Sequence, residues 1–336
     1  MMMRLFGALI ALCSIAAGPA VISKFKAVTL ADQTSLARND ALIGRLFSPF
    51  AAADLAKKNG PKTLGEYPVD PKEERFGLYV PAQKPDRGYA LLVWVSPLDG
   101  AGMPPGWPDV LESRGVIFVT AARSGNLTSP IGRRFPLALI AAANVPRLHP
   151  IDPDRIWISG FSGGSRIAER LALAYPDVFS GAILDGSSDD IVWADVPLPP
   201  RANFERLLDR TAIVFSSGET DAYNVEAAEK VASSLRRHCF DRLSIEVRRR
   251  EGHVIMDGRS LAKAIDFLDR PRGKPSSGDR QCRDRLFSKI DGELARAERL
   301  VQKRGRGARG AIDAIDRRYG WLAAPRSLDL RARVDP

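Results

Sequence analysis

Short apolar runs alternate with helically periodic segments along residues 74–269, and this alternation constrains the fold more than any other feature. The runs are apolar at consecutive positions, as strands buried on both faces must be. Helical spacing appears between them, for example at Ile167, Leu171 and Ala174. The pattern predicts an α/β fold, a mostly parallel sheet with helices on both faces. The expected strands are Phe76–Val80, Tyr89–Val95, Val116–Ala121, Arg155–Ser159, Ala182–Leu184, Ala212–Phe215 and Leu243–Val247.

A glycine-flanked serine follows the fourth of these runs. Residues 159–165 read Ser-Gly-Phe-Ser-Gly-Gly-Ser and contain Gly-x-Ser-x-Gly at positions 160–164. Because a strand precedes this motif and a helix follows it, the setting is that of a nucleophile elbow, in which a sharp turn exposes the serine hydroxyl. The flanking glycines leave room for the neighbouring strand and helix. Ser162 is therefore the candidate nucleophile.

A serine nucleophile needs a general base, and the chain has 3 histidines. His149 precedes the elbow and does not fit the chain order Ser, acid, His. His238 is expected at the end of a helix, where a capping role is favoured. His253 lies in a loop after the last expected strand, so it is the candidate base.

Two aspartates compete for the role of the acid that orients the imidazole. Asp221 ends a loop after the strand Ala212–Phe215, and Asp185 follows the preceding strand. Acids at the ends of neighbouring parallel strands can reach the same histidine. Asp221 is favoured and Asp185 is the alternative, although either aspartate could also be a turn or helix-capping residue.

The stretch from Asp152 to Ser165 resembles the elbow of secreted esterases related to polyhydroxybutyrate depolymerases and feruloyl esterases, within the α/β-hydrolase family. The resemblance covers roughly residues 74–269. It implies the triad order Ser, Asp, His. Two features depart from the pattern. The His-Gly motif usual after the third strand is absent, and Gly163 stands where depolymerase-like members often carry Asn or another polar residue.

Enzymes of this kind bind the oxyanion with two backbone N–H groups, one of them on the residue after the nucleophile. Gly163 supplies that donor. The second is expected in the loop at residues 95–102, where Pro97 has no N–H and Leu98 is the candidate.

These residues predict a serine hydrolase that cleaves carboxylic esters, either small or polymeric, through an acyl-enzyme. No cofactor is implied. No cysteine or histidine spacing indicates a metal site. A peptidase or amidase on the same fold is one alternative, because acyl transfer to an amine uses the same triad. A non-catalytic binding protein of this fold is the other.

The N-terminus predicts export to the periplasm or the cell exterior. Residues 1–20 contain one arginine, a short apolar run and then small residues, which is typical of a cleaved signal peptide. No stable membrane insertion is expected once it is removed. The mature chain then has two cysteines, and an exported chain with such a pair suggests a disulfide between Cys239 and Cys282. Residues 21–73 form an N-terminal lead-in without identifiable chemistry.

The net charge of +10 is concentrated at the C-terminus, where residues 270–336 hold 18 basic and 9 acidic side chains. A linker-like stretch opens this extension, and an amphipathic helix follows with Leu286, Ile290 and Leu294 on one face. The catalytic region is nearly neutral, and no aromatic-basic interleaving supports a nucleic-acid partner. We expect this helix to pack against the rest of the protein rather than to bind an anionic surface.

Overall fold

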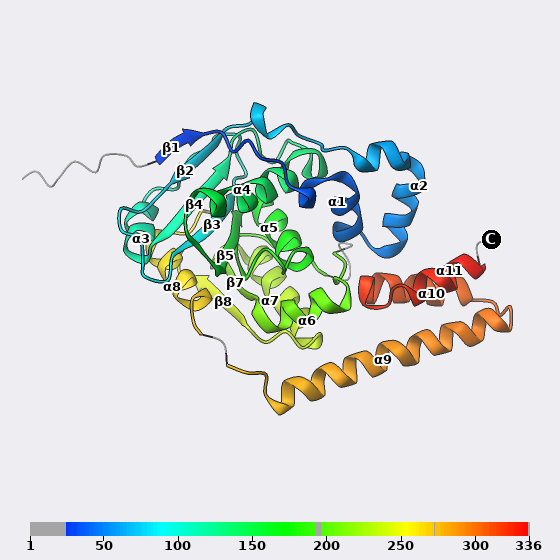
Figure 1. Ribbon diagram of the computed structural model, residues 1–336. Helices are drawn as coiled ribbons and strands as arrows, with labels where there is room; N and C mark the ends of the chain where they lie inside the picture. Colours follow the sequence, from blue (N-terminus) through cyan, green and yellow to red (C-terminus); the bar gives the residue numbers. More distant parts are fainter. Residues whose placement is uncertain (1–24, 192–195, 272, 335–336) are drawn as a thin grey trace, which may run out of the picture.

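Eight strands form a single sheet at the centre of the computed structural model, which describes residues 25–191, 196–271 and 273–334 (Figure 1). The strand order is β1-β2-β4-β3-β5-β6-β7-β8. The first two pairings in this order, β1 with β2 and β2 with β4, are antiparallel, and the remaining neighbours pair in parallel. The strands are β1 (Phe25–Val28), β2 (Phe76–Tyr79), β3 (Tyr89–Val95), β4 (Val116–Ala121), β5 (Ile151–Phe161), β6 (Gly181–Asp185), β7 (Ala212–Gly218) and β8 (Leu243–Arg248).

Helices cover both faces of the sheet, because the central strands are apolar on both sides. On β3, Leu92 and Trp94 pack toward α3 and α8, whereas Leu91 and Val93 belong to the larger core under α4, α5 and α7. The helices are α1 (Asn39–Leu46), α2 (Pro49–Gly65), α3 (Trp107–Arg114), α4 (Phe135–Leu148), α5 (Gly163–Ala174), α6 (Arg201–Arg210), α7 (Ala222–Arg237), α8 (Gly258–Leu268), α9 (Ser277–Gln302), α10 (Ala308–Tyr319) and α11 (Arg326–Val334).

All seven expected strands are present, and this architecture is the α/β-hydrolase fold, as the alternation predicted. The bounds of β3 and β4 match the predicted ones, while β5, β6 and β7 extend beyond the apolar runs that indicated them.

The N-terminal lead-in contributes more than the sequence indicated. It contains the edge strand β1 and the helices α1 and α2. β1 has four residues and an exposed centre at Lys26 and Ala27, so it gave no apolar run to recognise. The proposed domain boundary at residue 74 stays a prediction.

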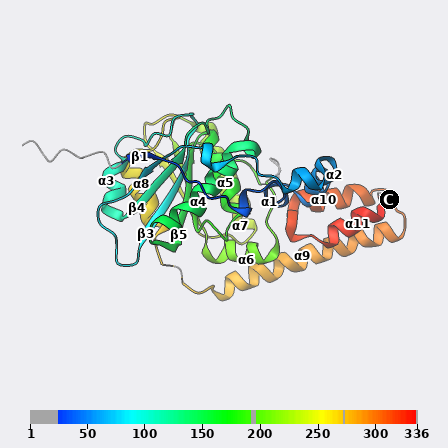
Figure 2. The same cartoon turned by 45° about the horizontal axis from the view of Figure 1, so that its top comes forward.

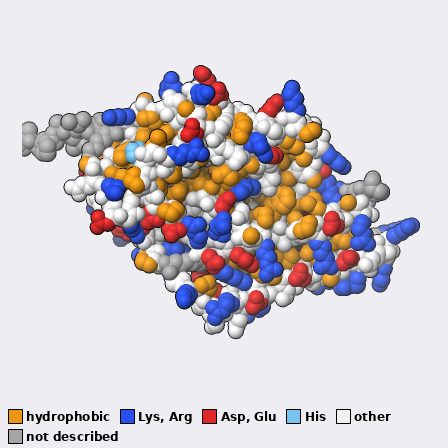
Figure 3. All heavy atoms as spheres, viewed as in Figure 1, with side chains coloured by type: hydrophobic (Ala, Val, Ile, Leu, Met, Phe, Trp, Pro, Cys, Tyr) orange, Lys and Arg blue, Asp and Glu red, His pale blue; other side chains and the backbone are white. Residues whose placement is uncertain are grey.

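The predicted amphipathic helix is confirmed as α9, whose side chains Leu286, Ile290 and Leu294 are buried. With α10 and α11 it forms a helical appendage beside the sheet, and α2 lies next to it in two views (Figures 1 and 2). Lys and Arg side chains gather over these C-terminal helices (Figure 3). The expected disulfide joins Cys239, after α7, to Cys282 in α9, with a Cα–Cα distance of 5.8 Å.

The predicted signal peptide, residues 1–20, lies outside the described residues. Within the residues that are described, no helix combines the length and the apolar character needed to cross a membrane. The same residues contain no group of three or more His, Cys, Asp or Glu side chains arranged to hold a metal ion.

Candidate active site

Ser162 occupies the sharp turn between β5 and α5. Its backbone has φ 53° and ψ −124°, a conformation that a non-glycine residue adopts only under strain. Neighbouring backbone explains the two glycines of the motif. A Cβ at Gly160 would lie 2.3 Å from the carbonyl carbon of Gly164, and one at Gly164 would lie 1.9 Å from the carbonyl oxygen of Val95. The turn therefore needs glycine at both positions.

His253 reaches the serine from the loop after β8. Its Nε2 lies 3.0 Å from Ser162 Oγ, although the two residues are 91 positions apart. The ring packs on Phe161 with a centroid distance of 4.8 Å, and its side chain is 41% exposed. Gly186 lies below it, where a Cβ would meet His253 Cε1 at 3.2 Å. The imidazole is thus held beside the hydroxyl and still faces the solvent-accessible side.

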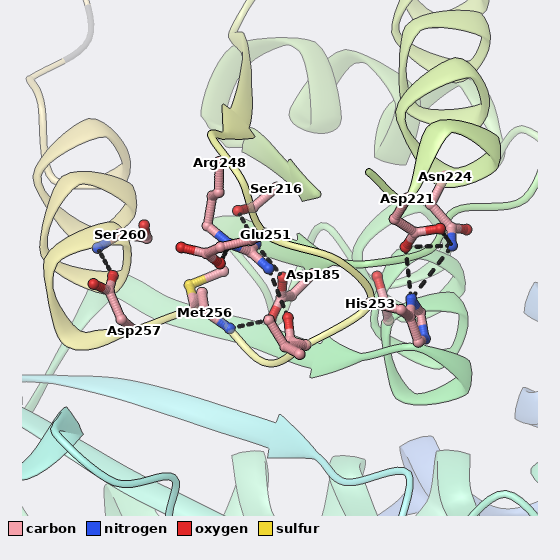
Figure 4. Close-up of polar contacts among 12 residues, drawn as sticks. Asp185, Ser216, Asp221, Asn224, Arg248, Glu251, His253, Met256, Asp257 and Ser260 are labelled. Atoms are coloured by element: carbon pink, nitrogen blue, oxygen red, sulfur yellow. Dashed lines mark hydrogen bonds and ion pairs between the residues drawn. The ribbon is translucent and has the colours of Figure 1, made fainter. Parts of the chain in front are cut away.

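Asp221 contacts the other side of the same ring. Its Oδ2 lies 2.7 Å from His253 Nδ1, and its side chain is 13% exposed. Figure 4 shows a further residue at this carboxylate, Asn224 of α7, whose Nδ2 donates to Oδ1 at 2.9 Å and to Oδ2 at 2.8 Å. Sequence reasoning missed Asn224. Its spacing of three residues from Asp221 at the start of a helix was the available signal.

Asp185 is placed differently. It is 2% exposed, and its Oδ1 accepts from Arg248 Nη1 at 2.7 Å while Oδ2 accepts the Met256 N–H at 2.8 Å (Figure 4). Arg248 in turn donates to the carbonyl of Val254 at 2.6 Å. Burial raises the pKa of Asp185 to about 6, against the opposing effect of the Arg248 charge. This pair binds the backbone on the C-terminal side of His253, and the carboxylate bonded to the ring is that of Asp221.

A cavity of about 970 Å³ opens beside Ser162. One wall is apolar and comes from the lead-in helices and from the turn before α4, and another carries arginines of α5. Such a volume suits a small-molecule ligand. The apolar lining residues include Leu46, Phe47, Ala51, Ile131, Phe135 and Ile167.

The C-terminal appendage holds the lead-in part of this wall in place. Ser48 Oγ donates to Asp316 Oδ2 at 2.5 Å, and the Phe50 N–H donates to Asp316 Oδ1 at 3.3 Å. Trp321 Nε1 donates to the carbonyl of Phe47 at 2.9 Å. The segment that lines the cavity is therefore fixed by residues more than 260 positions away in the sequence.

The two expected oxyanion donors, Gly163 and Leu98, differ in their surroundings. Gly163 is the first residue of α5, so the helix does not use its N–H. The Leu98 N–H donates to Ser96 Oγ at 2.9 Å, its side chain is 69% exposed, and it is not among the residues lining the cavity. Asn126, which sequence reasoning missed, lines the cavity instead. A Cβ at Gly163 would meet its Oδ1 at 2.3 Å, which gives a physical reason for glycine there.

Fold and geometry together define an α/β-hydrolase fold that brings a serine, a histidine and an aspartate into one hydrogen-bonded row. No protein-family model matches the chain, and no curated protein matches it in sequence.

Among solved structures, the chain is similar to an acetyl xylan esterase from Aspergillus awamori, with 14% identity, a TM-score of 0.43 and coverage of 59% of this chain and 95% of that one. It is also similar to a poly(3-hydroxybutyrate) depolymerase from Bordetella parapertussis, with 15% identity, a TM-score of 0.43 and coverage of 62% and 88%. A dipeptidyl peptidase 4 from Porphyromonas gingivalis is similar at 15% identity, with a TM-score of 0.43 and coverage of 58% and 33%.

Proposed function

We propose that the protein is a serine hydrolase that cleaves carboxylic esters, with Ser162 as nucleophile, His253 as general base and Asp221 as the acid that orients the base. The observation that carries the proposal is the row of contacts from Asp221 to His253 Nδ1 and from His253 Nε2 to Ser162 Oγ, at 2.7 and 3.0 Å, beside a large cavity. These are hydrogen-bonding distances for a nucleophile and its base.

The chemistry follows from these contacts. With its Nδ1–H donated to Asp221, the neutral imidazole presents the Nε2 lone pair to the Ser162 hydroxyl. His253 takes that proton as Oγ attacks the ester carbonyl, and it then gives the proton to the leaving alcohol as the acyl-enzyme forms. Water, deprotonated by the same nitrogen, hydrolyses the acyl-enzyme and releases the acid. The negative charge of Asp221 stabilises the imidazolium in both steps.

The tetrahedral oxyanion needs donors that are already in position. We assign the first to the Gly163 N–H and the second to the Asn126 side-chain amide, in place of Leu98. The support for Asn126 is its contact with Gly163 and its place in the cavity lining, neither of which Leu98 shares. The donor of this side chain is Nδ2, which would lie 3.1 Å from a Cβ at Gly163.

We further propose that the protein acts outside the cytoplasm. The Cys239–Cys282 disulfide supports this location, since such bonds form and persist in oxidising compartments. The secretion signal at residues 1–20 remains a sequence-based proposal.

The test is labelling by a fluorophosphonate probe together with hydrolysis of p-nitrophenyl esters and of matched anilides and peptides. We expect wild-type protein to be labelled and to cleave esters, and Ser162→Ala to lose both properties. Ser113→Ala, whose exposed hydroxyl bonds the Val110 carbonyl on α3, is the matched control and should behave as wild type. Faster cleavage of anilides and peptides than of esters would favour the peptidase alternative. Unlabelled and inactive wild-type protein would favour a binding role.

A further inference from the structure

The cavity beside Ser162 carries an excess of positive charge. Three arginines line it, Arg134, Arg166 and Arg170, whereas Asp189 is the single carboxylate among the described lining residues. This contrasts with the near-neutral balance of the region that forms the sheet. A cavity whose walls carry one sign of charge concentrates ligands of the opposite sign.

Arg134 contributes a cation that no carboxylate contacts within the described residues. It is 4% exposed, and its guanidinium donates to the carbonyls of Ser124 and Ser96, each at 3.0 Å. The charge of Asp99 acts on it, but that carboxylate accepts the Gly125 N–H at 2.9 Å and lies outside the cavity lining. An arginine stays protonated even when burial lowers its pKa, so Arg134 adds positive potential to the cavity.

Arg166 lies in the first turn of α5, four residues after Ser162, and both residues line the cavity. Its Nε donates to Ser187 Oγ at 2.8 Å and lies 3.4 Å from Asp189 Oδ1. Within the described residues, these contacts engage Nε and leave both terminal nitrogens without a hydrogen-bonded partner. A guanidinium fixed through Nε presents two parallel donors, which is the geometry that a carboxylate accepts.

Asp189 contacts both arginines of α5 that line the cavity, and Asp190 and Glu226 line an adjoining pocket beside Arg166. Asp189 is shared with Arg170, whose Nη2 lies 3.1 Å from Oδ2. Glu169 accepts the Asp189 N–H at 2.6 Å and is 1% exposed. Burial raises the pKa of Glu169 to about 8, so at pH 7 this side chain is mainly neutral. Asp189 is therefore shared between Arg166 and Arg170.

We infer that the ester cleaved at Ser162 carries a carboxylate group, which Arg166 binds through its terminal nitrogens. The inference rests on the proposed function and names its substrate class. The apolar part of such an ester packs against lining residues such as Leu46, Phe47 and Ile131, while the carboxylate is bound at Arg166. Esters of this class include hemiesters of dicarboxylic acids and esters of hydroxy acids with a free carboxyl group.

Two substrate pairs test this, and each pair differs only in charge. One pair is the mono-p-nitrophenyl ester of glutaric acid and the same ester of its monoamide. The other pair is the butyrate ester of 3-hydroxybenzoic acid and that of 3-hydroxybenzamide. We expect kcat/KM in at least one pair to be about tenfold or more higher for the carboxylate, as a charge-assisted bidentate contact provides. In Arg166→Gln this ratio should fall to about one, and Arg166→Lys should retain part of it.

Arg201→Gln is the matched control, because it removes the same charge from an exposed i,i+4 pair with Glu205 on α6, outside the cavity lining. It should leave the ratio unchanged. Ser162-dependent hydrolysis with equal rates within both pairs would overturn the inference and leave the proposed function intact. A preference that persists in Arg166→Gln would also overturn the assignment to Arg166. Loss of hydrolysis of all four substrates in wild type would overturn the proposed function together with the inference.

Discussion

Asp185 and Asp221 lie at the ends of neighbouring parallel strands, and both act on the loop that carries His253, but they contact different parts of it. Asp221 is partly accessible and bonds the imidazole itself. Asp185 is sealed in the interior, where it bonds Arg248 and the backbone N–H of Met256. One acid therefore orients the ring and the other fixes the loop.

The position of an aspartate at the end of a strand makes it a candidate for the acid that orients His253. Only the contacts of its carboxylate decide which aspartate has that role. The carboxylate of Asp185 is fully engaged by a guanidinium and a backbone N–H. That of Asp221 is held by a neutral amide, Asn224, and keeps one short contact for the histidine. A neutral partner leaves the charge of Asp221 available to stabilise an imidazolium.

The largest effect is expected at Asp221. Asp221→Asn should lower kcat about 10³- to 10⁴-fold, because the amide no longer stabilises the imidazolium and favours the wrong tautomer. The free energy of unfolding should change little, since Asn224 and the new amide can still bond. Steady-state kinetics with a p-nitrophenyl ester measures the loss, and Asp109→Asn, on the exposed first turn of α3, is the control. A large loss of kcat in Asp185→Asn with little loss in Asp221→Asn would reverse the two roles.

Asp185→Asn should instead act mainly on stability. It turns one of the two acceptor oxygens into an amide donor that faces the Arg248 guanidinium or the Met256 N–H, and a buried donor left without an acceptor costs about 1–3 kcal/mol. Urea unfolding followed by fluorescence measures the change. The kcat of the folded variant should fall much less than in Asp221→Asn, because the ring keeps its own acid. A free energy of unfolding within about 1 kcal/mol of wild type would show that this pair does not hold the loop.

The smallest effect is a pH dependence of stability that comes from Asp185. Burial raises its pKa to about 6 in the folded protein, above that of the unfolded chain, so between about pH 4 and pH 6 the unfolded chain binds fewer protons. The free energy of unfolding should therefore decrease as pH rises through this window, by about 3 kcal/mol in total, and be independent of this group above it.

Comparison with Asp185→Asn isolates this contribution, since other titrating groups are common to both proteins. Unfolding free energies measured from pH 4 to pH 8 should draw closer together as the pH rises. Parallel curves for the two proteins would mean that Asp185 keeps an ordinary pKa in the fold.

Much of the sheet and the elbow could be predicted because their signals are local. The strands are apolar at consecutive positions, and the motif around Ser162 consists of adjacent residues whose turn geometry follows from glycine at 160 and 164. The disulfide could be predicted as well, because an exported chain without residues 1–20 has only two cysteines, Cys239 and Cys282. The edge strand β1 had no such signal, because it is short and its two central residues, Lys26 and Ala27, are exposed.

The choice between Asp221 and Asp185, and the donor role proposed for Asn126, could not be predicted in the same way. Each depends on which groups lie nearby in space. Asn126 belongs to the loop after β4, not to the loop after β3 that holds Leu98, and only the close approach of that loop to Gly163 brings it to the cavity.

By itself, the sequence determined an α/β sheet with a serine at a strained strand-to-helix turn, because periodicity and glycine spacing act over a few residues. It also placed the excess charge on the C-terminal helices. The tertiary structure decided what those helices do: Asp316 and Trp321 bond the segment at residues 47–50 that forms a wall of the cavity. It likewise decided which carboxylate meets His253. Such contacts join side chains that are distant along the chain, and only packing brings them within hydrogen-bonding distance.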